Sequence, residues 1–193
     1  MVGPARRPRK RARNAGEETL DAARHVAARD GAAHLTLEAV AREIGMTKGG
    51  VLYNFPTKAD LLQGMLERMV ETFGQIVDEP VAASGPEVAN PALKAVLEAY
   101  ACLESIDSEL FMAILAAAVN DPDLIEPVRE LKNRLQAQVM ADAADPALAM
   151  VVMVAIDGLH FERMMRLPPQ DPKLRARIAE RLKSLVAAME AGR

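Results

Sequence analysis

The sequence contains no tryptophan, a single cysteine and few aromatic residues, which make up 3% of its 193 positions. One cysteine excludes an intrachain disulfide framework. Cys102, within the apolar stretch AYACLESI, is expected to be a buried, inert thiol rather than a redox sensor. Long alternating runs of Val, Ile and Thr are also missing, whereas Ala, Leu, Met, Glu and Arg are abundant. The composition therefore predicts an all-α protein.

The sequence also lacks a segment that could cross a membrane. Its longest apolar run, Ala147 to Ile156, is ten residues long and is followed by Asp157. That length is about half of a membrane span. The basic start MVGPARRPRKRARN is not followed by an apolar stretch, so it does not have the pattern of a secretory signal. Together with the single cysteine, these features predict a cytoplasmic protein.

Charge is distributed unevenly along the chain. Residues 1–60 hold 11 Lys/Arg against 7 Asp/Glu, a net charge of +4, whereas residues 61–193 hold 13 against 20, a net charge of −7. Arg6 to Arg13 contains six basic residues in eight, and we expect residues 1–14 to form a disordered basic arm. The asymmetry is typical of nucleic-acid binding at the N-terminal side, but a basic tail could equally serve solubility.

Apolar spacing and capping residues predict about nine helices. Three short helices are expected at 17–29, 37–44 and 47–53, and a long one from about 58 to 77, with 79–88 as the main loop. A break near 107–108 divides the next helical segment. Four dipeptides that pair an N-cap with a proline at the first helical position predict the later starts: Asn90-Pro91, Asp121-Pro122, Asp145-Pro146 and Asp171-Pro172.

The segment TKGGVLYNFPTK, residues 47–58, places two glycines inside a predicted helix. Each costs about 0.8–1.0 kcal/mol relative to alanine, so the helix loses nearly 2 kcal/mol of local stability. Two short helices around Gly45-Met46 match a helix-turn-helix, whose second helix lies in a DNA major groove. Missing side chains at Gly49 and Gly50 would let its backbone approach bases and phosphates. The alternative is that the glycines mark an irregular loop.

The segment TLEAVAREIGMTKGGVLYNFPTKADLL, residues 36–62, resembles the DNA-binding head of the TetR family of bacterial transcriptional regulators. The resemblance implies a DNA-binding domain at 15–60, with 47–53 as recognition helix, and an effector-binding and dimerisation domain at 61–193. Many relatives have His at the position of Asn54, so the hydrogen bond made there is replaced or lost. The implied DNA contacts are Thr36, Thr47, Lys48, Gly49, Gly50, Tyr53 and Lys58.

DNA recognition of this kind predicts a homodimer. One recognition helix reads few base pairs, so a palindromic operator requires a second copy about 34–36 Å away. The last helix carries an apolar stripe, and the segment 147–161 is apolar on more than one side, which requires cover on both faces. Relatives pair through their last two helices. The alternative is that both stripes are filled within one subunit.

The body is expected to hold a small apolar effector, as bodies of similar regulators commonly do. Methionine is deformable and suits an adaptable pocket, but it is also common core filler. Asp157 and His160 stand out because a polar group in an apolar helix needs a partner. The candidates are Met65, Met69, Phe73, Tyr100, Leu103, Phe111, Met112, Leu115, Met153, Asp157, His160 and Phe161.

The residues offer little material for an enzyme. His25, His34 and His160 have no metal-ligand spacing with the lone cysteine, and Gly49-Gly50 lacks the strand and spacing of a dinucleotide site. We therefore expect no catalysis, no metal and no cofactor. The sequence predicts a repressor that an effector releases from a palindromic operator. The alternative is a nucleoid-type protein that binds any duplex through its basic arm.

Overall fold

The computed structural model describes residues 8–85, 88–102, 108–165, 167 and 171–191. These ranges contain nine α-helices and no strand, which confirms the all-α prediction. None of the described helices is long and apolar enough to span a bilayer. The elements are α1 (Pro8–Asp30), η1 (Ala32–His34), α2 (Leu37–Glu43), α3 (Lys48–Asn54), α4 (Lys58–Ala83), α5 (Pro91–Cys102), α6 (Ser108–Ala118), η3 (Pro122–Ile125), α7 (Glu126–Ala141), α8 (Pro146–Met164) and α9 (Pro172–Ala191).

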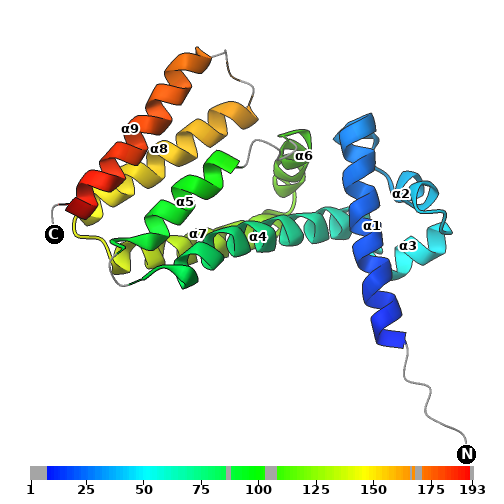
Figure 1. Ribbon diagram of the computed structural model, residues 1–193. Helices are drawn as coiled ribbons and strands as arrows, with labels where there is room; N and C mark the ends of the chain where they lie inside the picture. Colours follow the sequence, from blue (N-terminus) through cyan, green and yellow to red (C-terminus); the bar gives the residue numbers. More distant parts are fainter. Residues whose placement is uncertain (1–7, 86–87, 103–107, 166, 168–170, 192–193) are drawn as a thin grey trace, which may run out of the picture.

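The helices form a small head and a larger body joined by α4 (Figure 1). Helices α1, α2 and α3 lie together at one end, and α8 and α9 lie side by side at the other. Two apolar cores follow this division. Four residues of α4 pack with the head and with α6: Leu61, Leu62, Met65 and Leu66. Phe73 and Val77 of α4 pack instead with α5, α7, α8 and α9. One continuous helix therefore connects the two cores, and the predicted boundary at 60/61 falls inside it.

The expected disordered arm is wrong for residues 8–14, which form the first turns of α1. Arg, Lys and Ala are strong helix formers, and the segment continues into a helix whose apolar face is anchored in the head. Ala23, Val26 and Ala27 are almost completely buried there. Residues 1–7 of the predicted arm lie outside the described part of the chain.

The long helix also exceeds its predicted end at Val77, because α4 continues to Ala83 through Pro80. Proline has no backbone N–H, so one hydrogen bond of the helix is lost and the helix normally ends there. Here the surrounding turns are held by packing, since Val77 is fully buried and Val81 packs against the body core. Half of the predicted loop at 79–88 is therefore helical.

Three of the four predicted helix starts have the expected cap. Asn90 and Asp145 each accept the backbone N–H three residues on, at 3.1 and 3.0 Å, and Asp171 accepts the one two residues on, at 3.0 Å. The fourth prediction is wrong in detail, because Asp121 opens the 3₁₀ turn η3 and α7 begins only at Glu126. The backbone oxygen of Asp121 accepts the Leu124 N–H, the group that the Asp121 side chain was expected to cap.

Asn90 joins α5 to α7, and its replacement tests how much this junction contributes. Its side chain is buried, donates to the Val139 carbonyl oxygen at 3.0 Å and caps α5, with a backbone φ of 43°. Asn90→Ala is expected to lower the free energy of unfolding by about 2–4 kcal/mol, because it removes a cap and leaves a buried carbonyl unpaired. Asn90→Asp keeps the cap acceptor and should lose less. Urea denaturation measures both, and equal stability of all three proteins would contradict this role.

Candidate nucleic-acid interface and body cavity

Helices α2 and α3 form the predicted helix-turn-helix. Gly45, at the turn, has a φ of 64°, a left-handed conformation that favours glycine. Thr47 caps α3, because its hydroxyl oxygen accepts the Gly50 N–H at 3.2 Å. Val40 and Val51 are fully buried and attach the pair to α1 and α4. The short α3 is therefore held by tertiary packing, and the irregular-loop alternative is wrong.

The space around the two glycines of α3 differs. A Cβ on Gly49 would meet only the hydroxyl oxygen of Thr47, at 3.9 Å, and Gly49 is exposed. A Cβ on Gly50 would lie 3.0 Å from the terminal methyl of Met46, a flexible group that would have to shift slightly. Internal packing therefore does not require glycine at position 49, and its cost to the helix has no explanation within the monomer.

The predicted DNA contacts lie on the exposed part of the head. Tyr53 is 80% exposed, and Thr36, Lys48 and Lys58 are also exposed. Lys48 is not free, because its ammonium pairs with the carboxylate of Glu38 on α2. This hydrogen bond lowers the pKa of Glu38 below its usual value. Sequence reasoning missed Glu38, since two residues ten positions apart on different helices give no local signal.

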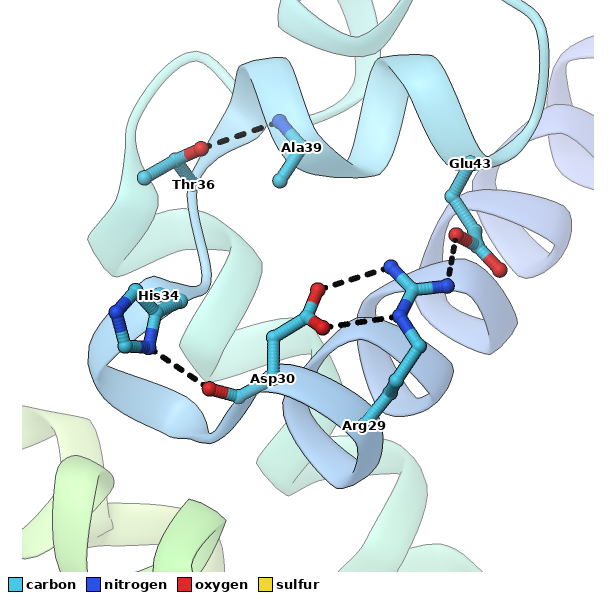
Figure 2. Close-up of polar contacts among 6 residues, drawn as sticks. All are labelled: Arg29, Asp30, His34, Thr36, Ala39 and Glu43. Carbon is cyan, nitrogen blue, oxygen red and sulfur yellow. Dashed lines mark hydrogen bonds and ion pairs between the residues drawn. The ribbon is translucent and has the colours of Figure 1, made fainter.

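A second polar network, also missed, fixes α1 against α2 (Figure 2). Arg29, near the end of α1, donates to Glu43 of α2 at 2.8 Å and to both carboxylate oxygens of Asp30, at 3.0 and 2.9 Å. The guanidinium lowers the pKa of Asp30. The backbone oxygen of Asp30 lies 2.7 Å from Nδ1 of His34, just before the start of α2. Exposed pairs add little stability, and this network links the end of α1 to the last residue of α2.

The C-terminal end of α3 is anchored by the two residues that follow Tyr53. Asn54 donates to the Gly50 carbonyl oxygen at 3.4 Å, a weak bond within α3 itself. Phe55 packs against the head core at a point where α4 has Gly64, and a Cβ there would lie 2.8 Å from its ring. The absence of a side chain at Gly64 thus lets α4 support the end of α3.

Four predicted effector residues form one cluster in the body: Phe73, Tyr100, Asp157 and His160. Asp157 of α8 accepts a hydrogen bond from the Tyr100 hydroxyl of α5 at 3.2 Å and pairs with Lys132 of α7. The Tyr100 ring packs edge-on against Phe73 and His160, with centroids 5.0 and 5.3 Å away. Burial, and then the charge of Asp157, raises the pKa of Tyr100, so its hydroxyl stays a donor. Burial likewise lowers the pKa of His160, which favours the neutral imidazole.

A cavity of about 440 Å³ lies beside this cluster, between α5, α8 and α9. Its size is within the usual range for small-molecule sites. Tyr100 and His160 are the two predicted residues that reach it. It is lined by Leu97, Tyr100, Ile156, Leu159, His160, Arg163, Arg175, Ala176, Ala179 and Leu182.

The twelve effector candidates do not surround one cavity. Met65 and Met69 pack in the head core, Met153 is buried in the body core, and Phe161 is 50% exposed on α8. Phe111, Met112 and Leu115 are partly buried on α6, and Leu103 lies outside the described residues. Residue type alone therefore did not separate cavity walls from core.

Comparisons with known proteins agree with this architecture. Residues 20–65 match the family described as bacterial regulatory proteins, tetR family, and residues 90–187 match the tetracyclin repressor-like C-terminal domain. The chain belongs to the TetR family. Its members are DNA-binding transcriptional regulators and in general not enzymes. A search of curated proteins gave no match.

Solved structures share the fold of this TetR-family regulator. The multidrug-binding protein EbrR with imidazole is 25% identical, with 86% of this chain and 93% of that chain covered and a TM-score of 0.61. A TetR-family member from Streptomyces coelicolor A3 is also 25% identical, covering 87% and 97%, with a TM-score of 0.66. A transcriptional regulator from Rhodococcus sp. Rha1, 21% identical, covers 92% and 96% with a TM-score of 0.68 and supports the fold alone.

Proposed function

We propose that this regulator is a homodimeric repressor that binds a palindromic operator and leaves it when a small molecule occupies the body. The observation that carries the proposal is the exposed Gly49 on α3, where nothing in the monomer requires a glycine. A recognition helix that presses its backbone against DNA does require one. The residues proposed to contact DNA are Thr36, Thr47, Lys48, Gly49, Gly50, Tyr53 and Lys58.

The dimer is proposed to form through α8 and α9. Val151, Val154 and Phe161 are 61, 63 and 50% exposed and repeat at intervals that place them along one face of α8. Met165, 38% exposed, directly follows the helix. Gly158 lies between them, and a Cβ there would have no neighbour within 4 Å, so a second helix could approach closely. An exposed apolar stripe of this length is typical of an interface.

Helix α9 is consistent with the same interface. Leu182 and Val186 are buried in the body core, whereas Leu174 and Leu185 remain 47 and 41% exposed. The alternative that both apolar stripes are filled within one subunit therefore does not account for these exposed side chains. A second copy would cover them together with the stripe on α8, in line with the pairing that the family resemblance implies.

A nucleoid-type protein that binds DNA without sequence preference is the rival. A gel-shift competition separates the two, using DNA from upstream of the protein's own gene and random duplex as competitors. The repressor should keep a preference of about 1,000-fold or more for its operator. Equal competition by both duplexes, with a steep dependence on salt, would favour the rival.

Lys48→Ala is expected to lower DNA affinity roughly tenfold, because it removes a phosphate partner and leaves the Glu38 carboxylate uncompensated next to the DNA. The slope of log affinity against log salt should fall by about 1 per protomer. Lys183→Ala is the control, since Lys183 also forms an exposed ion pair, but within α9. Titrations at several salt concentrations measure both. A salt slope unchanged by Lys48→Ala would remove Lys48 from the contacts.

Release by an effector requires coupling between the body and the head. The neighbour EbrR is described as a multidrug-binding protein, and its solved complexes include ethidium and proflavin, which supports a ligand site in this body as well. Helix α4 contributes to both cores, so it is proposed to transmit the change. Thermodynamic linkage then demands that effector and operator weaken each other's binding by the same factor. Independent binding of the two would contradict release.

A further inference from the structure

The cavity in the body combines an apolar wall with a basic end. Leucine, isoleucine and alanine side chains of α5, α8 and α9 supply the wall. The charged groups are Arg163 of α8 and Arg175 of α9, which come from opposite sides of the α8–α9 connection. Among the described residues, no carboxylate lines this space. An apolar body with one negative group would match this distribution of side chains.

Asp157, which directly follows Ile156 of this wall, already has two partners. Asp157 is bonded to Lys132 and to the Tyr100 hydroxyl, so its charge is balanced on the α7 side of α8. His160 lines the cavity in the form that burial favours, the neutral imidazole, and therefore adds no charge. Arg175 therefore places a positive charge beside a described lining that contains no carboxylate, which disfavours a cationic ligand.

Arg175 also has a hydrogen-bond donor left over. Its Nε is buried and has no hydrogen-bond partner among the described residues. Buried donors in proteins are nearly always paired, so an unpaired one needs an explanation. A guanidinium presents Nε–H and Nη–H as a planar fork that fits the two oxygens of a carboxylate.

We infer that the cavity binds an amphipathic carboxylate, whose acid group meets Arg175 and whose apolar chain lies along α5, α8 and α9. The inference rests on the proposed effector-responsive function and adds the chemical class of the effector. EbrR has been solved with ethidium and with malachite green, but those ligands belong to that protein. The ligand class inferred here follows instead from the two arginines in the lining of this cavity.

Isothermal titration calorimetry with three ten-carbon probes tests the ligand class on the full-length protein. Decanoate, decan-1-ol and decylammonium share one chain and differ in charge. Decanoate should bind about tenfold more tightly than decan-1-ol, and decylammonium should bind most weakly, because a charge-assisted hydrogen bond is worth that much. Equal affinity for decanoate and decan-1-ol, preference for decylammonium, or no binding of decanoate would each overturn the inference.

Two variants locate the acid group. Arg175→Gln is expected to weaken decanoate about tenfold and to leave decan-1-ol unchanged. Arg177→Gln is the matched control, because Arg177 is exposed on the same helix and does not line the cavity. Circular dichroism verifies that both variants fold. An Arg175→Gln protein that retains the preference for decanoate over decan-1-ol would show that Arg175 does not hold the acid.

The failure of this inference can be separated from failure of the proposed function. Operator binding without any probe reports on the regulator alone, whereas the three probes report on the cavity. If the protein binds its operator and decylammonium releases it, the proposed function is supported and the carboxylate ligand is contradicted. If the protein binds decanoate but no specific duplex, the carboxylate ligand is supported and the repressor function is contradicted.

Discussion

Replacing Val154 with arginine is expected to separate the proposed dimer and to lower operator affinity by about 100-fold or more, since each head would then bind its half-site alone. Val154 is 63% exposed at the centre of the α8 stripe, next to Gly158, where a partner helix could approach closely. An arginine there faces solvent in a monomer but would bury an unpaired charge in a dimer. The monomer fold should therefore survive while association is lost.

The matched control is Val119→Arg, which places the same charge on another exposed apolar position. Val119 is 81% exposed and directly follows α6, so it belongs to neither α8 nor α9. Analytical ultracentrifugation gives the oligomeric state of each protein, and fluorescence anisotropy with labelled operator gives its affinity. A Val154→Arg protein that remains dimeric would show that α8 does not form the interface.

Replacing Gly49 with leucine is expected to lower operator affinity by about 100-fold, because a side chain would enter the contact in both half-sites at a cost of about 1–3 kcal/mol each. Stability should not fall. The added Cβ would meet no atom closer than the Thr47 hydroxyl at 3.9 Å, and leucine favours a helix over glycine by about 0.8 kcal/mol. This opposite effect on folding and on binding separates a DNA-contact role from a structural one.

Gly16→Leu provides the comparison, since Gly16 also lies in a helix with no atom within 4 Å of an added Cβ but outside the proposed contacts. Urea denaturation and anisotropy titration measure the two quantities for each variant. Both leucine variants should be at least as stable as the parent protein, and only Gly49→Leu should bind the operator more weakly. Unchanged operator affinity for Gly49→Leu would mean that α3 does not press its backbone against the bases.

The head could be predicted because its signals are local. Thr47 and Gly45 lie within a few residues of the structure that they determine. Thr57 and Asp60 form a capping box at the start of α4, with the Thr57 N–H donating to Asp60 at 2.8 Å. The same locality explains the correct starts at Asn90 and Asp145. Where local rules were wrong, as at Pro80, packing far along the chain decided the outcome.

The cavity could not be predicted because its residues are separated in the sequence. Tyr100, His160 and Arg175 are on α5, α8 and α9, and they meet only through the way those helices cross. Arg163 lies three residues after His160, a helical spacing that could have indicated a shared face. Arg175 gave no such signal, since its place depends on how α9 returns along α8.

Methylation interference on the operator tests the central claim most directly. Two copies of α3 are expected to lie in major grooves about 34–36 Å apart, roughly 10 base pairs from centre to centre. Methylation of guanine N7, which lies in the major groove, should block binding at two symmetric clusters with that separation. The Gly49→Leu protein should show neither cluster under the same conditions. Interference at a single cluster, or none despite tight binding of the duplex, would contradict the account.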